Sequence, residues 1–194
     1  LIVLAVLGVA VAFTGSGSGL RVERILAFLD PIGHKQDHAW QLVQSLYAVS
    51  SGGLFGVGLG QGRQKFDYLA AEPHNDFIFA TIGEELGFVG SAFVVLMYAY
   101  FIYRGILIAR KASSHFGRLV AFGLTFIIGL QAAVNISVSI GMVPPTGLTL
   151  PFISYGGSSL VATCMMVGIL LNISRPKVED RLEDRLEERP EVKR

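Results

Sequence analysis

A run of apolar residues at 119–140 contains no ionisable side chain, and it constrains the fold more than any other feature. A helix needs roughly 17–25 mostly apolar residues to cross the hydrocarbon core of a bilayer, and this run meets that length. Only 16% of the chain is charged and 52% is hydrophobic, whereas an average soluble domain has about 25% charged residues. The sequence therefore predicts an all-α protein that crosses a membrane several times.

Three further apolar runs, at 1–13, 77–103 and 159–173, complete the predicted membrane domain. The last two are expected to span the bilayer beside the run at 119–140. The first is shorter than a spanning helix and lacks the basic flank and cleavage site of a signal peptide, so we interpret it as the end of a truncated span. The chain is therefore interpreted as the C-terminal part of a larger membrane protein.

Basic residues in the connecting segments predict the orientation of the chain. The short loop expected at 104–118 has no acid but contains four basic residues, Arg104, Arg110, Lys111 and Arg118. The charged tail at 175–194 begins with Arg175 and Lys177. Because short basic loops mark the cytoplasmic side of a membrane, we place this loop and the C-terminal tail in the cytoplasm. The loops at 14–76 and 141–158 then lie outside.

The long external loop at 14–76 is expected to carry short amphipathic helices. Apolar residues recur at helical spacing at 21–29 and again at 40–50. The glycine-rich run at 52–62 is interpreted as a turn-rich loop that packs close to other backbone. It is not a nucleotide site, because it lacks the Gly-Lys-Ser/Thr of a P-loop and the strand context of a Rossmann turn.

A cluster of charged residues lies where this external loop meets the span at 77–103. Asp76 is the last charged residue before the span, and Glu72 and His74 precede it. An Asp in front of a helix is most often an N-cap. The same position at the membrane face also suits a general base, and the two roles are compatible. His74 by itself is more typical of a hydrogen bond within a loop than of a base.

Polar side chains inside the predicted spans need partners. Glu84 and Glu85 lie within the span at 77–103, where ionised groups are costly. Adjacent helix positions are about 100° apart, so the two acids cannot both face lipid, and we interpret them as structural groups. Gln131 and Asn135 lie one turn apart on an otherwise apolar span. We predict that they form interhelical hydrogen bonds rather than bind substrate.

Two more groups of residues are candidates for binding a substrate. Arg63 and Lys65 are the cations nearest to Asp76 in sequence, and such a pair suits either a diphosphate or lipid head groups. The segment at 144–159 is rich in proline and glycine, and irregular backbone at membrane depth persists only where protein or a cavity satisfies it. Its hydroxyl side chains are expected to line a polar site: Thr146, Ser154, Tyr155 and Ser158.

Seven segments, in unbroken order from about Leu20 to Ser174, resemble the SEDS family (shape, elongation, division and sporulation), which includes FtsW, SpoVE and RodA. The segments are Arg24–Pro31, Gln41–Leu46, Gly52–Gly60, Gln64-Lys65, His74–Ala80, Gly83–Phe88 and Gly147–Ser159. The family's membrane domain has ten spanning helices, so the resemblance implies that this chain is the last four of them. The Gln64-Lys65 pair and Gly83-Glu84-Glu85-Leu86-Gly87 resemble the FtsW/SpoVE branch more than RodA.

The resemblance implies a peptidoglycan glycosyltransferase that polymerises lipid II at the outer face of the bacterial cytoplasmic (inner) membrane. The family's essential aspartate falls on Asp76, which would act as a general base toward the acceptor sugar. Arg63 and Lys65 are candidates for holding the diphosphate of the leaving group, on charge and proximity. The family usually has Leu-Pro-Glu before its His, whereas this chain has Ala71 before Glu72 and one residue more.

Partners and cofactors follow from the same resemblance. The family works with a class B penicillin-binding protein, a transpeptidase, and with proteins of the divisome or elongasome; membrane lipid is also expected, and nucleic acid is not. A divalent cation, Mg²⁺ or Mn²⁺, is compatible with binding the diphosphate, but no cluster of metal ligands fixes its position. The single cysteine, Cys164, excludes a disulfide framework or a zinc cluster.

Two other functions fit parts of the sequence. A lipid II flippase or transporter would use Glu84, Glu85, Gln131 and Asn135 along a substrate path at the middle of the membrane. A scaffold that recruits the transpeptidase explains the apolar spans but not the acids around Asp76.

Overall fold

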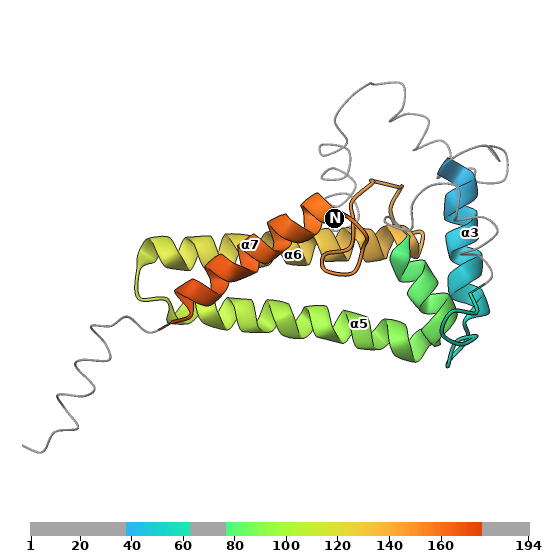
Figure 1. Cartoon of the computed structure of the whole chain (residues 1–194), viewed down its shortest axis with the longest axis horizontal. Helices are drawn as coiled ribbons and strands as arrows, with labels where there is room; N and C mark the ends of the chain where they lie inside the picture. Colours follow the sequence, from blue (N-terminus) through green and yellow to red (C-terminus); the bar gives the residue numbers. More distant parts are fainter. Residues whose placement is uncertain (1–37, 63–76, 176–194) are drawn as a thin grey trace, which may run out of the picture.

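The computed structural model describes residues 38–62 and 77–175 of the chain (Figure 1). Within these residues every regular element is a helix: α3 (His38–Ser51), α5 (Ile78–Lys111), α6 (His115–Ser139) and α7 (Gly157–Ile173). Both α5 and α6 are long and apolar enough to cross a membrane, and α7 is a shorter apolar helix. The prediction of an all-α membrane protein is confirmed, while the span at 1–13, the helix at 21–29 and the tail after Arg175 lie outside the described residues.

Helix α5 consists of two segments separated at Gly87, which corrects the predicted single span at 77–103. Gly87 has φ 67° and ψ −163°, a region of backbone conformation that essentially only glycine occupies. Figure 1 shows the short first segment running at a steep angle to the long second segment, which extends along α6. The continuous straight part of α5 therefore begins after the break.

The loop predicted at 104–118 is almost entirely helical. Helix α5 continues to Lys111 and α6 begins at His115, so only 112–114 connect them. The Ser114 hydroxyl caps α6 by accepting a hydrogen bond from the Gly117 amide at 3.0 Å. The prediction was wrong here because a helix need not end where the bilayer ends, and Arg and Lys are good helix formers in water.

Small residues allow α5 and α6 to pack closely. A β-carbon added to Gly105 of α5 would lie 2.2 Å from the Thr125 hydroxyl oxygen of α6. Nearby, Ala109, Ala121 and Leu170 form a buried cluster that brings α7 onto the pair. Close contact through small residues is typical of helices that associate within a membrane.

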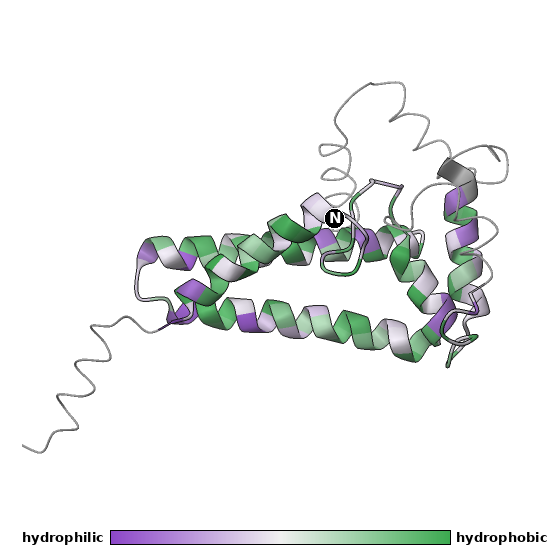
Figure 2. Ribbon diagram, in the orientation of Figure 1, coloured by the Kyte–Doolittle hydropathy of each residue, from purple (hydrophilic) through white to green (hydrophobic). Residues whose placement is uncertain are grey.

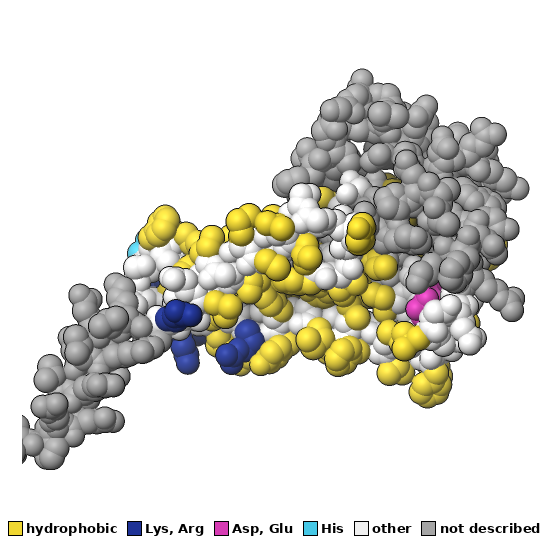
Figure 3. Space-filling view, viewed as in Figure 1, with side chains coloured by type: hydrophobic (Ala, Val, Ile, Leu, Met, Phe, Trp, Pro, Cys, Tyr) yellow, Lys and Arg dark blue, Asp and Glu magenta, His cyan; other side chains and the backbone are white. Residues whose placement is uncertain are grey.

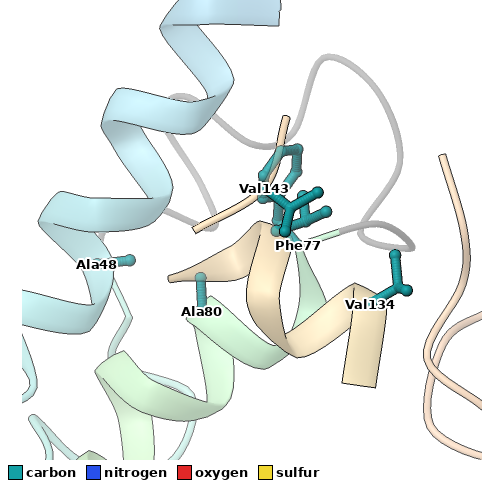
Figure 4. Close-up of a cluster of buried hydrophobic side chains, with 6 residues drawn as sticks. Ala48, Phe77, Ala80, Val134 and Val143 are labelled. Atoms are coloured by element: carbon teal, nitrogen blue, oxygen red, sulfur yellow. The ribbon is translucent and has the colours of Figure 1, made fainter. Parts of the chain in front are cut away.

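Helix α3 confirms the helix expected at 40–50 and lies across one end of α5 and α6 (Figure 1). It buries Leu42, Ser45 and Ala48 and exposes Tyr47. Figure 4 shows Ala48 of α3 facing a cluster that joins the start of α5 to the end of α6. The buried members of the cluster are Ala48, Phe77, Ala80, Val134, Val138 and Val143.

The surface has an apolar middle and charged ends. Figure 2 shows apolar residues along the whole length of the long helices, and side chains such as Phe93, Leu96, Phe122 and Phe126 are exposed there. Figure 3 shows Lys and Arg gathered at the end where α5 turns into α6, and acidic side chains at the opposite end. An apolar surface of this extent faces lipid or other protein rather than water.

Candidate functional site

Five of the predicted site residues lie outside the described part of the chain: Arg63, Lys65, Glu72, His74 and Asp76. The described residues on either side of this segment are both buried, Gly62 at one end and Phe77 at the other. Phe77 packs in the cluster with Val138 and Val143. The candidate site is therefore built from the residues that surround these two positions.

The glycine-rich loop after α3 completes the hydrogen bonding of α5 at its break. In a continuous helix the amides of Phe88 and Val89 would bind the carbonyls of Glu84 and Glu85. Here the Phe88 amide donates to the Gly53 carbonyl at 2.9 Å and the Val89 amide donates to the Leu54 carbonyl at 3.2 Å. The loop is thus inserted into the hydrogen-bond ladder of the helix.

The two helical carbonyls that the break releases are bound by the same loop. The amide of Val57 donates to the Glu84 carbonyl at 3.0 Å, and the amide of Gly58 donates to the Glu85 carbonyl at 3.1 Å. These two amides and two carbonyls of α5 therefore have partners in the loop, as irregular backbone at a membrane requires.

Glycine is needed at two positions on the loop side of this contact. A β-carbon on Gly52 would lie 1.9 Å from the Gly83 carbonyl oxygen, and one on Gly56 would lie 2.1 Å from the Glu85 carbonyl oxygen. Both distances are far below the van der Waals limit. The interpretation of 52–62 as a loop packed against other backbone is confirmed.

The carboxylates of Glu84 and Glu85 converge on Gly62. Glu84 is 3% exposed and Glu85 is half-buried. A β-carbon on Gly62 would lie 3.0 Å from Glu84 Oε2 and 3.3 Å from Glu85 Oε1. The two acids precede the break at Gly87 and lie at one end of the bundle, so they are not part of the continuous helix that follows the break. Their depth in a membrane stays a prediction.

The segment at 144–159, which we call the Pro/Gly segment, is held against α5 and α6 by polar side chains from both helices. Gln131 Nε2 donates to the Thr149 carbonyl at 2.9 Å, and Asn135 Nδ2 donates to the Leu148 carbonyl at 2.6 Å. The Tyr98 hydroxyl donates to the Pro151 carbonyl. Gln131 and Asn135 were predicted to form interhelical hydrogen bonds; their amide nitrogens bind loop carbonyls, which have no helical donor of their own.

Ser154 supports the conformation of this segment. Its side chain is buried, and its hydroxyl accepts a hydrogen bond from the Leu150 amide at 2.7 Å. Phe152, two residues earlier, has φ 68°, which is strained for a residue with a side chain. Its ring meets Phe101 of α5 edge to face, with the ring centroids 6.0 Å apart. A buried hydroxyl in such a turn serves the fold.

The other predicted hydroxyls differ in exposure. Tyr155 is 87% exposed, Ser158 is exposed and Thr146 is half-buried. The sequence reasoning missed the contact between Thr149 and Ser159, whose hydroxyl oxygens are 2.9 Å apart and join the segment to α7. The sequence did contain a signal for this contact, because both residues lie in the segment at 144–159 that was predicted to line a polar site.

An apolar cavity of about 360 Å³ lies beside the Pro/Gly segment. Its walls come from α5, chiefly Phe93, Met97 and Tyr98, and from Phe152 and Ile153 of the segment. An apolar cavity of this kind is chemically suited to hydrocarbon groups.

The metal prediction is not settled by these residues. Over 38–62 and 77–175, no group of three or more His, Cys, Asp or Glu side chains is arranged to hold a metal ion. Mg²⁺ or Mn²⁺ therefore stays a prediction without an assigned position.

Comparison with known proteins places the chain in a family. A family model described as cell cycle protein, which covers FtsW, RodA and SpoVE, matches residues 1–179. The chain is 51% identical over 155 residues to stage V sporulation protein E of Bacillus subtilis (strain 168), covering 80% of this chain and 42% of that protein. It is 47% identical over 154 residues to the probable peptidoglycan glycosyltransferase FtsW of Geobacter sp. (strain M18), covering 79% and 42%.

A solved structure agrees with these matches. The chain superposes with a TM-score of 0.64 and 31% identity on a protein from a structure described as "Structural coordination of polymerization and crosslinking by a peptidoglycan synthase complex". The likeness covers 79% of this chain and 41% of the other. The chain thus spans about two fifths of the length of the relatives that it matches.

Proposed function

Because this chain belongs to the FtsW/RodA/SpoVE family of cell cycle proteins, we propose that the intact protein is a peptidoglycan glycosyltransferase. It polymerises lipid II at the outer face of the bacterial inner membrane. The observation that carries the proposal is the family match over 1–179, which includes Asp76 and both of its flanks. The relatives named as glycosyltransferases support the activity, and the stage V sporulation relative supports a role in division, septum or spore wall synthesis.

Asp76 is the general base of the proposed reaction. Its carboxylate accepts the proton of the acceptor sugar hydroxyl while that oxygen forms a bond to the anomeric carbon of the donor. The bond from that carbon to the diphosphate oxygen breaks, and undecaprenyl diphosphate leaves with the electron pair. Phe77, the next residue, is buried against Val138 and Val143, which supports a fixed backbone beside the base.

Arg63 and Lys65 stabilise the charge that develops on the diphosphate, and a divalent cation, Mg²⁺ or Mn²⁺, would share this task when bound. Gly62, immediately before Arg63, lies against the carboxylates of Glu84 and Glu85. This contact supports a role for the two acids in orienting the start of the basic segment.

The remaining predicted residues are assigned to the other parts of the substrate. Glu72, His74, Thr146, Tyr155 and Ser158 contact the sugar and peptide portions of lipid II. Ser154 is excluded from this set because its hydroxyl is buried and binds the Leu150 amide. The apolar cavity between α5 and the Pro/Gly segment receives part of the undecaprenyl chain, since its volume of about 360 Å³ and its apolar walls suit hydrocarbon.

The proposed topology places the α5–α6 turn and the C-terminus in the cytoplasm, with α3 and the Pro/Gly segment outside. The basic residues gathered at the α5–α6 turn support this orientation (Figure 3). A class B penicillin-binding protein is the proposed partner, and the structural relative from a peptidoglycan synthase complex supports it.

The proposal is tested by Asp76→Asn in the intact protein with purified lipid II as substrate. We expect the variant to fold and to bind its partner, and to lose glycan polymerisation. Ser137→Ala is the matched control, because that hydroxyl only donates to the Ala133 carbonyl within α6, at 2.7 Å. Normal polymerisation by the Asn variant would falsify the assignment of the base.

A lipid II flippase is the second candidate, and the described residues favour it less. Gln131 and Asn135 bind loop carbonyls rather than line a path, and Glu84 lies at the break near one end of the bundle. An assay that separates translocation from polymerisation distinguishes the two functions. Translocation alone, abolished by Glu84→Gln and not by Asp76→Asn, would favour the flippase.

A further inference from the structure

A groove of about 620 Å³ lies between the ends of α5 and α7, at the opposite end of the molecule from Glu84 and Gly87. Its polar lining consists of three cations and two hydroxyl side chains: Arg104, Lys111, Arg175, Ser113 and Ser174. Figure 3 shows the dark blue Lys and Arg side chains grouped at this end. The groove is therefore a basic site at the end of two membrane helices.

The inner wall of the same groove is apolar. Phe101 and Ile108 of α5 and Val167 and Leu171 of α7 line it. Along α5, about 15 Å of helix separate Phe101 from Lys111. The groove thus runs from a hydrocarbon-like surface to a cationic mouth, which is the polarity of an amphiphile with an anionic head.

The charge of these cations is not offset by acids in the described part of the chain. The only carboxylates over 38–62 and 77–175 belong to Glu84 and Glu85, at the opposite end. The carbonyls at the end of α7 also have donors: the Ser174 amide binds Leu170 at 3.1 Å, the Ser174 hydroxyl binds Leu171 at 2.7 Å, and the Arg175 amide binds Asn172 at 3.2 Å. The partial negative charge at the C-terminal end of α7 is correspondingly reduced.

We propose that this groove binds an anionic phospholipid of the adjacent leaflet. The phosphate contacts Arg104, Lys111 and Arg175, and the acyl chains lie along the apolar wall. Arg and Lys at the end of a spanning helix reach the headgroup region readily, and basic pockets between such helices select anionic headgroups. A soluble anion would use the cations and leave the apolar wall exposed, so lipid matches the whole groove.

The test uses the intact protein in bilayers of equal phosphatidylglycerol and phosphatidylcholine, followed by native mass spectrometry of retained lipid. We expect retention of phosphatidylglycerol over phosphatidylcholine. Each of Arg104→Gln, Lys111→Gln and Arg175→Gln should weaken retention about fivefold, as expected for one cation near a membrane surface. High salt should weaken it as well.

Arg110→Gln is the matched control, because Arg110 is an exposed cation of α5 that does not line the groove. It should leave retention unchanged. Equal retention of the two lipids by the wild type, or the same loss in Arg110→Gln as in the three groove variants, would overturn the proposal. If another part of the intact protein fills the groove, the wild type should retain the two lipids equally, and this outcome would also overturn the proposal.

Two further experiments identify what occupies the groove. Residues 177–194 carry many acids and bases, and a variant that ends at Pro176 should retain phosphatidylglycerol as the wild type does. Retention that appears only after this truncation would mean that the tail occupies the groove, against the proposal. Inorganic phosphate in excess should not displace the lipid; full displacement would indicate a site for soluble anions and would also contradict it.

Discussion

Gly56 and Gly87 are in direct backbone contact, and a β-carbon on Gly87 would lie 2.3 Å from the Gly56 amide nitrogen. One belongs to the loop after α3 and the other to the break in α5. The contact brings the loop between α3 and Gly62 against the two glutamates that precede the break. It therefore fixes one boundary of the segment that leads to Asp76.

Replacing Gly87 by Ala should destabilise the protein severely. The φ of 67° with ψ −163° costs about 1–3 kcal/mol for a residue with a side chain, and the clash with Gly56 adds to it. The measurement is the thermal unfolding midpoint in detergent.

Two glycines serve as controls for Gly87→Ala. Gly53→Ala should cost only the strain of its φ of 54°, because nothing lies near its added β-carbon. Gly123→Ala, in open space on α6, should be neutral or stabilise by about 0.5–1 kcal/mol. Equal midpoints for Gly87→Ala and Gly123→Ala would contradict the close contact.

Removing the donor at Asn135 should loosen the Pro/Gly segment. Asn135→Leu leaves the Leu148 carbonyl without its side-chain donor, and such bonds in membranes contribute about 0.6–1.7 kcal/mol. We expect faster hydrogen exchange at the Leu150 amide, which Ser154 binds within the same segment. Ser137→Ala on the same helix should leave this exchange unchanged, and unaltered exchange in Asn135→Leu would count against the anchoring role.

Gly105→Ala should push α5 and α6 apart. Its β-carbon would meet the Thr125 hydroxyl oxygen at 2.2 Å and the Thr125 methyl carbon at 2.4 Å, and overpacking of this kind costs about 1–3 kcal/mol. Thr125→Ala in the same molecule should restore part of the loss. A double-mutant cycle on unfolding midpoints measures the coupling, and strictly additive effects would refute the contact.

Replacement by Ala should affect stability at Ser154 and substrate binding at Ser158. Ser154→Ala leaves the buried Leu150 amide without its acceptor and should cost about 1–3 kcal/mol of stability. Ser158 is exposed, so Ser158→Ala should change stability by less than about 0.5 kcal/mol and raise the KM for lipid II if it contacts the substrate. Measuring the free energy of unfolding and the steady-state kinetics of both variants tests whether Ser154 is structural and Ser158 contacts the substrate.

Hydropathy predicted the spanning helices well, because length and apolar content are properties of the chain itself. The expected runs at 119–140 and 159–173 match α6 and α7, although α6 begins four residues earlier, at His115, and α7 begins two residues earlier, at Gly157. Helix ends outside the bilayer were missed at 104–118, since nothing in hydropathy separates a basic helical turn from a loop.

The break at Gly87 could not be predicted from its neighbours. Glycine is tolerated in membrane helices, so Gly83 and Gly87 were equally compatible with close helix packing. Only the contact with residues far away in sequence distinguishes them. The same limit applies to Gln131 and Asn135: their polarity predicted buried hydrogen bonds, but the partner depends on which loop folds over them. The role of Asp76 stays a prediction, because it lies outside the described residues.

The insertion of the loop into the ladder of α5 constrains the length of the loop as well as its glycines. Residues 53 and 54 pair with the amides after the break, and residues 57 and 58 pair with the carbonyls before it. Adding or deleting one residue between Leu54 and Val57 would shift one pair out of register while leaving the other in place. Relatives with this bend should therefore tolerate changes of side chain at Phe55 far better than a change in spacing.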